Sequence, residues 1–247
     1  MTAPGTHVEK AMGTVFSFDL RDPLPGGALG DVLDWLHRVD RTFTTYDEGS
    51  WIRRIDRGEA RVEDAPAEVG VVLDLCEAME VATDGWFSVR AGGRLDPSGL
   101  VKGWAVERAA RMLAAAGSHR HAVGGGGDVQ AVGRISAGRP WRIGVVHPHD
   151  PQRLLAVVEG DGIAVATSGT SERGLHVLDP RTGRGADTLA AVTVVGSDLT
   201  RADVYATAAL AMGDRAYSWL RGLPEFAALV VAADGSVWRT GDFPAAA

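Results

Sequence analysis

From residue 120 onward the chain consists mainly of short apolar, β-branched runs separated by turn signals. Runs of this kind, broken by Gly, Pro and Asp, predict short strands joined by tight turns. They read AVGGGGDVQAVG, WRIGVV, LLAVVE, IAVATS, GLHVL and AAVTVVG. The later stretch FAALVVAADGSVWRT predicts a closing hairpin that turns at Asp234-Gly235. Because the strands cluster instead of alternating one for one with helices, they favour an α+β fold with largely antiparallel sheet.

The first half of the chain carries the helical patterns. After strand-like alternation in MGTVFSFDL, apolar residues recur at helical spacing from Leu29 to Phe43. A second helix is predicted to follow Asp64-Ala65-Pro66, with Pro66 in its first turn, and to run to about Thr83. A third follows Ser98-Gly99 and ends at Gly117. Two more helical segments are expected near residues 200–221, so the 247 residues suit one large domain or two intimately packed lobes.

Charge and hydropathy exclude several classes of protein. The net charge is −7, and no Lys/Arg run exceeds a few residues, which argues against a nucleic-acid-binding protein. No apolar run reaches membrane-spanning length, and the first twenty residues do not resemble a secretion signal. We therefore expect a cytoplasmic protein with neither a nucleic acid nor a membrane as partner.

The chain has one cysteine, Cys76, in the helical run VVLDLCEAME. A single cysteine excludes an intrachain disulfide and a cysteine-based zinc site. Its apolar neighbours at helical spacing predict a buried structural thiol and not a nucleophile.

Residues 198–213 place the carboxylate of Asp203 and the hydroxyl of Thr207 four positions apart in a small, apolar helix. At 3.6 residues per turn both oxygens project from one face. Mg²⁺ takes oxygen ligands and needs only one or two protein groups when phosphates and water supply the rest. The same residues also fit a capping box, with Thr200 as the N-cap and Asp203 at N3. The pattern alone leaves both interpretations open.

Three further stretches have a chemical and an ordinary interpretation. Four glycines at 124–127, followed by Asp128, could expose backbone N–H groups to a phosphate, or form a plain turn. Residues 96–103 combine a carboxylate, a helix start that favours anions and Lys102, or form a loop with a solvated lysine. His176 lies in a predicted strand before a D-P-R-T-G turn and could act as a general base or be an ordinary histidine.

Eight blocks of sequence occur in a fixed order along nearly the whole chain. They are AMGT (11–14), TYD (45–47), TDGWF (83–87), D-x-SG-x-x-KGWAV (96–106), GGD (126–128), ATSG (166–169), HVLDPRTG (176–183) and D-x-x-x-T (203–207). In this order they resemble the blocks of the ApbE-type flavin transferases. The ordered set is far more specific than any one block.

The resemblance implies a single domain over residues 1–247 with largely antiparallel sheets flanked by helices, in the T-fold-related, two-lobed architecture of that family. It also implies an activity. Family members are Mg²⁺-dependent FAD:protein FMN transferases, which split the pyrophosphate of FAD and attach FMN through a phosphoester to a threonine or serine of an acceptor protein, releasing AMP. The chain has no acceptor-like D-x-x-[ST]-[GS]-A-T segment, so its acceptor is expected to be another protein.

Carried over by position, the resemblance also implies the site residues. Mg²⁺ would be held by the carbonyl of Gly99 with Asp203 and Thr207, and His176 could take the proton from the incoming hydroxyl. FAD would be contacted by Met12, Tyr46, Trp86, Phe87, Ser88, Asp96, Lys102 and Val177.

Two other functions remain open. If water replaced the acceptor hydroxyl, the protein would be an FAD pyrophosphatase that gives FMN and AMP. It could also be a non-catalytic flavin-binding or assembly protein. The segment after Phe87 is shorter than is usual in the family, which predicts a more open flavin side of the pocket.

Overall fold

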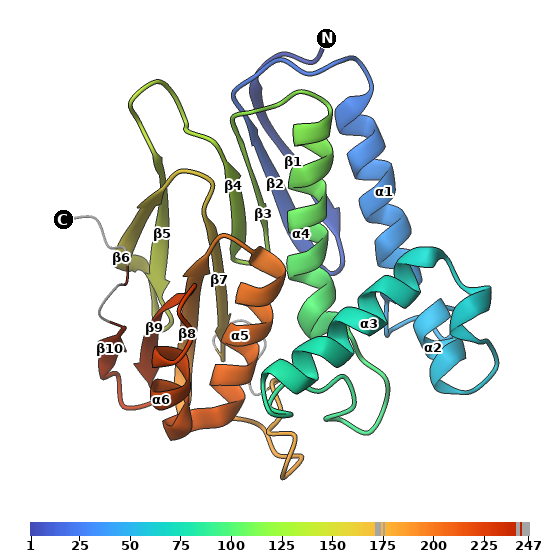
Figure 1. Ribbon diagram of the computed structural model, residues 1–247, viewed down its shortest axis with the longest axis vertical. Coiled ribbons are helices and arrows are strands. Elements are labelled where there is room, and N and C mark those ends of the chain that lie inside the picture. The colour runs from blue at the N-terminus through green and yellow to red at the C-terminus, as the bar shows by residue number, and fades with distance from the viewer. Residues whose placement is uncertain (171–173, 175, 241–242, 244–247) are drawn as a thin grey trace.

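The computed structural model describes residues 1–170, 174, 176–240 and 243. Its centre is an eight-stranded sheet in the order β1-β2-β3-β4-β7-β8-β9-β10, with every neighbouring pair antiparallel (Figure 1). A separate hairpin is formed by β5 and β6. The strands are β1 Gly5–Ala11, β2 Thr14–Leu20, β3 His121–Gly125, β4 Asp128–Val132, β5 Trp141–His147, β6 Asp150–Gly160, β7 Ala164–Gly169, β8 Leu189–Gly196, β9 Ala227–Ala232 and β10 Val237–Arg239. The predicted α+β fold with largely antiparallel sheet is confirmed.

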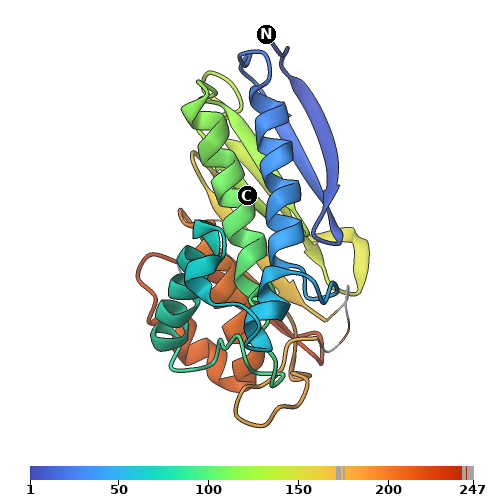
Figure 2. The same ribbon diagram turned by 90° about the vertical axis from the view of Figure 1, so that its right-hand side faces the viewer.

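Helices cover one face of this sheet. Helices α1 and α4 lie side by side over its β1–β4 half, and α5 covers β7 and β8 (Figures 1 and 2). The helices are α1 Ala28–Phe43, α2 Trp51–Asp56, α3 Ala67–Ala82, α4 Ser98–Ala115, α5 Leu199–Met212 and α6 Ala216–Arg221, with short 3₁₀ turns at Val62–Asp64 and Gly213–Arg215. Within the described residues, no helix is both long and apolar enough to cross a membrane.

Strand β8 shows why the central strands are so apolar. Val192 and Val194 belong to the large core beneath the helices, whereas Ala191 and Val195 belong to a smaller core on the other face. The β5–β6 hairpin covers this second face with Trp141 and other apolar side chains. Because both faces of β8 are buried, it forms a continuous apolar run and not an alternating one.

Several local predictions are wrong, each for a physical reason. The predicted strand GLHVL (174–178) is not one over its described residues, 174 and 176–178, where Leu178 makes only an isolated bridge to Gly185. The six-residue helix α2 was not predicted because it is too short to show periodicity. The capping box is also wrong, because α5 begins at Leu199 and Asp198 is the N-cap, accepting the Arg201 N–H at 2.9 Å.

Thr200, the residue expected to cap α5, bonds instead across to α4. Its backbone N–H donates to Oε2 of the buried Glu107 at 3.0 Å, and its hydroxyl donates to the same oxygen. Glu107 therefore ties the first turn of α5 to α4, and Asp203 is released from any capping role.

Cys76 is buried in the main core, as predicted. Burial raises the pKa of its thiol to about 12. A thiol with so little thiolate at neutral pH is a poor nucleophile, so Cys76 is structural.

His121, the first residue of β3, is fully buried beneath α4. Its Nε2 lies 3.0 Å from the Ala110 carbonyl, which can only accept, so Nε2 carries the proton and Nδ1 accepts from the Ser118 hydroxyl at 3.0 Å. Burial lowers the pKa of this imidazole below its ordinary 6.5, because desolvation disfavours the charged ring.

This histidine predicts a pH dependence of stability. Below pH 6.5 the unfolded chain takes up a proton at His121 that the folded chain does not, so the free energy of unfolding should fall as the pH falls, by up to about 1.4 kcal/mol per pH unit. Urea unfolding of the wild type and of His121→Gln at pH 5.5 and 7.5 tests this. Between pH 7.5 and 5.5 the free energy of unfolding should fall less in the variant than in the wild type. Equal decreases in both proteins would show that His121 is not the group responsible.

Candidate active site

A cavity of about 800 Å³ opens where the N-terminal end of α4, α5, β7 and the β3–β4 turn meet. This volume lies in the range of small-molecule and cofactor sites. Loops 86–99 and 176–180 and the tip of the β5–β6 hairpin complete its walls. The predicted site residues among its lining are Trp86, Phe87, Ser88, Asp96, Gly99, Lys102, His176, Val177, Asp203 and Thr207.

The polar end of the cavity is built on Asp128, Asp203 and Lys102. Both carboxylates are buried, with Asp128 fully inaccessible and Asp203 only 2% exposed. The Lys102 ammonium pairs with Oδ2 of Asp128 and lies 3.2 Å from Oδ2 of Asp203. Two buried carboxylates share one ammonium, so the formal charge of the three groups is −1, which a cation would compensate.

Asp203 is anchored to α4 through the backbone of Gly103. The Gly103 N–H donates to Asp203 Oδ2 at 3.0 Å. In a regular helix, the Gly103 N–H would donate to the Gly99 carbonyl, four residues earlier. The Asp203 carboxylate therefore competes with that carbonyl for the same N–H group. Over the described part of the chain, every recorded polar contact of Asp203 falls on Oδ2, which leaves Oδ1 for the cavity.

The other two predicted metal ligands lie next to Asp203. A Cβ on Gly99 would come within 3.8 Å of Thr207 Cγ2, so the first turn of α4 approaches Thr207 closely. The Thr207 hydroxyl lies 3.0 Å from Ser168 Oγ on β7. Among the described residues no cluster of three His, Cys, Asp or Glu side chains could hold a metal. The expected shell is of another kind, because it uses one such side chain together with a carbonyl and a hydroxyl.

The glycine run is both strand and turn. Gly124 and Gly125 lie in β3, where a Cβ would come within 2.7 Å of Ser17 Oγ and 2.8 Å of Val106 Cγ2. Gly126 and Gly127 have positive φ and form the two-residue turn into β4. This turn lines the cavity and presents Asp128 at the start of β4.

Trp86 and Phe87 form an aromatic wall of the cavity. Trp86 and Phe87 follow α3 in a turn that Thr83 holds, since its hydroxyl accepts the Phe87 N–H at 3.0 Å and donates to the Met79 carbonyl. The Arg181 guanidinium lies 4.1 Å from the Trp86 ring centroid, which links the D-P-R-T-G turn to this wall.

His176 lies at the exposed rim of the cavity. Its Nδ1 lies 3.1 Å from the Gly174 carbonyl oxygen. Because a carbonyl oxygen can only accept, Nδ1 is the protonated nitrogen and donates to it. That tautomer leaves the Nε2 lone pair free to accept a proton, as a general base requires. A backbone hydrogen bond holds the neighbouring Val177, whose carbonyl accepts the Ala186 N–H at 2.9 Å.

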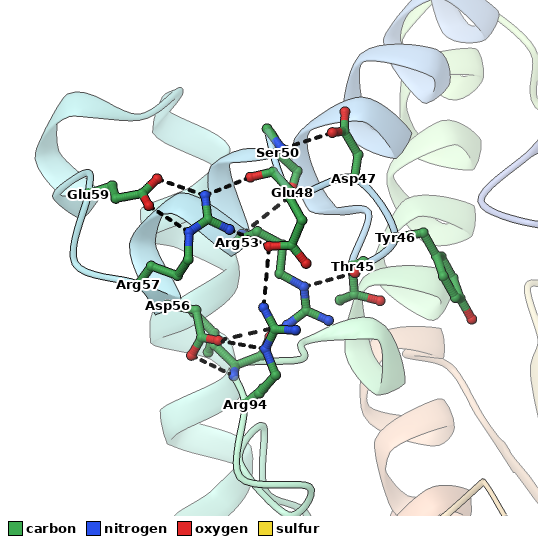
Figure 3. A network of polar contacts seen from close by, with 12 residues as sticks. Thr45, Tyr46, Asp47, Glu48, Ser50, Arg53, Asp56, Arg57, Glu59 and Arg94 are labelled. Carbon is green, nitrogen blue, oxygen red and sulfur yellow. Dashed lines mark hydrogen bonds and ion pairs between the residues drawn. The ribbon is translucent and has the colours of Figure 1, made fainter.

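Two residues expected to contact FAD do not line this cavity. Tyr46 is 97% exposed, and Figure 3 shows its ring directed away from the neighbouring polar network. Met12 lies in the β1–β2 turn with a φ of 53°, a strained conformation for this residue type. Both therefore stay predictions.

Sequence reasoning missed other lining residues. Asp128 ends the glycine run and the GGD block, and Ser168 lies in the ATSG block, but neither was assigned a role. Arg53 lies outside the ordered blocks and reaches the cavity through the packing of α2.

Comparison with known proteins identifies the family of this chain. A model of the ApbE family matches residues 88–230, more than half of the chain. The chain belongs to the ApbE family. The chain resembles the FAD:protein FMN transferase of Escherichia coli K12 at 32% identity over 129 residues, which are 48% of this chain and 37% of that protein. It resembles the FAD:protein FMN transferase of Rhodobacter capsulatus at 32% identity over 163 residues, 62% of this chain and 31% of that protein.

Solved structures of ApbE proteins share the whole fold. The ApbE protein of Thermotoga maritima superimposes with a TM-score of 0.87 at 23% identity, over 99% of this chain and 100% of that one. The flavin transferase ApbE of Vibrio cholerae superimposes with a TM-score of 0.82 at 20% identity, over 98% and 99% of the two chains. These likenesses establish the ApbE architecture. The sequence matches span well under half of the curated relatives' length.

Proposed function

We propose that this protein is a Mg²⁺-dependent FAD:protein FMN transferase. The observation that carries the proposal is the position of Asp203, buried at the end of an ~800 Å³ cavity with one oxygen held by Gly103 and Lys102. The names of the E. coli and R. capsulatus relatives support the same reaction.

The donor set suits Mg²⁺, which prefers a few oxygen ligands and keeps others from water and phosphate. Asp203 Oδ1, the Thr207 hydroxyl and the Gly99 carbonyl are the protein ligands in this proposal. When bound, Mg²⁺ would neutralise charge on the pyrophosphate and on the departing AMP. The excess negative charge of Lys102, Asp128 and Asp203 supports a cation at this position.

The remaining lining residues hold and orient FAD. The wall of Trp86 and Phe87 offers apolar surface to the flavin ring. With Mg²⁺ offsetting the carboxylates of Asp128 and Asp203, Lys102 could also donate to a phosphate oxygen. The Gly126-Gly127 turn lines the same cavity, and the backbone N–H groups of such a turn could bind a phosphate. Catalysis then depends chiefly on positioning and on charge.

In the transfer itself, an acceptor threonine or serine oxygen attacks the phosphorus on the flavin side of the pyrophosphate. The bond from that phosphorus to the bridging oxygen breaks, and the oxygen leaves on AMP. His176 Nε2 takes the hydroxyl proton in this proposal.

The test is incubation of the protein with FAD, Mg²⁺ and a synthetic peptide containing a D-x-x-[ST]-[GS]-A-T segment. A matched peptide carries alanine in place of the acceptor residue. We expect AMP and a flavin-bearing peptide in equal amounts, only with Mg²⁺ and only with the hydroxyl peptide. FMN and AMP without a modified peptide would instead identify a pyrophosphatase, and bound FAD without AMP would identify a binding protein.

A further inference from the structure

A buried arginine in α2 joins two loops beside the cavity. Arg53 is only 8% exposed, and its Nε donates to the Thr45 carbonyl at 2.8 Å (Figure 3). Its Nη1 donates to the Leu95 carbonyl at 3.4 Å. Helix α2 starts at the Ser50 N-cap, whose hydroxyl accepts the Arg53 N–H at 3.2 Å, so the backbone of this arginine is held as well.

Asp56, one turn later, binds the other side of the same peptide. Its Oδ1 accepts the Leu95 N–H at 2.9 Å, and its side chain is only 9% exposed. Arg90 and Arg94 also donate to this carboxylate, at 3.2 and 3.3 Å. The Leu95 N–H, followed by Arg94 and Arg90, lowers the pKa of Asp56 below its usual value, so the group stays charged.

Leu95 is therefore held at its N–H by Asp56 and at its carbonyl by Arg53. The next residue, Asp96, lines the cavity, and its Oδ1 accepts the Ser98 N–H at 2.9 Å at the start of α4. Residues 88–97 form neither helix nor strand, and their internal backbone bonds are those donated by the N–H groups of Ala91, Gly93 and Asp96. These bonds shape the loop, whereas Arg53 and Asp56 attach it to α2.

We propose that Arg53 and Asp56 form a clamp that holds residues 88–96 as the flavin-side wall of the cavity. The clamp is defined here as the two bonds that these side chains make to the Leu95 peptide group. Both act as positioning residues in this proposal. The Arg53 side chain, which also lines the cavity, donates to the carbonyls of Thr45 and Leu95 and lies 3.8 Å from Asp56 Oδ2. Asp56 accepts from the Leu95 N–H and from Arg90 and Arg94. The flavin-side role rests on the proposed function, whereas the holding of the segment does not.

Further ion pairs surround the clamp on its outer side. Arg94 also reaches Oε2 of Glu48 at 3.5 Å, and Arg57 pairs with that same oxygen (Figure 3). These outer contacts are exposed and are therefore weak. The buried bonds to Leu95 are the ones expected to matter.

The first test measures amide hydrogen exchange of residues 88–96 in ligand-free protein. Arg53→Met and Asp56→Ala should each raise exchange of the Leu95 amide by about tenfold, because each removes a charge-assisted bond from a segment without secondary structure. Asp56→Asn should restore part of the protection, because its amide oxygen can still accept the Leu95 N–H. Arg57→Met, in the same network but without contact to Leu95, is the matched control and should change exchange by less than twofold.

The second test separates positioning from chemistry. Arg53→Met and Asp56→Ala should each weaken FAD binding, followed by flavin fluorescence, by about tenfold, while AMP release at saturating FAD and Mg²⁺ stays within about threefold of wild type. Asp56 is the decisive position, because Arg53 lines the cavity and Asp56 is not among its lining residues. Arg57→Met should leave both the FAD affinity and the rate of AMP release unchanged.

The outcomes distinguish the two proposals. Unchanged Leu95 exchange in folded Arg53→Met and Asp56→Ala proteins would overturn the clamp. If the alanine variant fails to fold, Leu95 exchange is measured in Asp56→Asn instead, and exchange equal to that of wild type would count against the clamp. Raised exchange with unchanged FAD affinity would overturn the flavin-side role. A wild-type protein that binds no FAD would refute the proposed function, and the exchange data would still decide whether Arg53 and Asp56 hold the wall.

Discussion

Replacing Asp203 with alanine is expected to stop Mg²⁺-dependent release of AMP from FAD while the protein stays folded. The variant loses the only carboxylate proposed as a ligand. Even outer partners of metal ligands contribute about 10- to 100-fold to metal affinity, so affinity should fall by at least about 100-fold. Loss of charge stabilisation at the pyrophosphate should lower the rate by about 100- to 1,000-fold or more.

The fold should survive this change because the charges that remain are balanced. Lys102 and Asp128 stay paired, and the net charge of −1 at this end of the cavity disappears. Binding of Mn²⁺ by electron paramagnetic resonance, AMP by chromatography and thermal unfolding measure the three effects separately. Asp214→Ala, an exposed carboxylate just beyond α5, is the matched control and should behave as wild type. An Asp203→Ala protein that binds Mn²⁺ normally would refute the metal site.

Replacing Gly103 with alanine should destabilise the protein and disturb the same site from the other helix. An added Cβ would lie 2.7 Å from Asp203 Cβ, 2.9 Å from its Oδ2 and 3.1 Å from the Leu199 carbonyl. Since one of these neighbours is backbone, α4 and α5 must move apart. Such overpacking costs about 1–3 kcal/mol, more than the gain of up to about 1 kcal/mol in helix propensity.

Gly70→Ala is the matched control, because it makes the same substitution inside α3. There the new Cβ would meet nothing closer than Val62 Cγ1 at 3.8 Å. We expect it to raise the free energy of unfolding by about 0.4–1 kcal/mol. Urea unfolding of both variants compares them, and Mn²⁺ binding should weaken only in Gly103→Ala. A Gly103→Ala protein as stable as Gly70→Ala would show that the two helices are not packed as closely as described.

Local pattern predicted most of the elements. The apolar spacing from Leu29 to Phe43 matches α1, and the Asp234-Gly235 turn lies between β9 and β10. These succeed because periodicity and turn chemistry depend on neighbouring residues. The wrong predictions fall where residues far away in the sequence determine the local structure. GLHVL has strand composition without a strand at 176–178, and Thr200 resembles a cap but donates its hydroxyl to Glu107 on α4.

The sequence by itself determined that Asp203 and Thr207 share one face of a helix, since their spacing and the helical pitch suffice for that. The ordered blocks also determined the family. Only the tertiary structure decided that Lys102 lies between Asp128 and Asp203, and that Arg53 and Asp56 hold the peptide of Leu95. It also put Tyr46 outside the cavity. These relations join segments far apart in the chain, and they depend on how closely α4 packs on α5 at Gly103 and on where α2 docks, which no local pattern encodes.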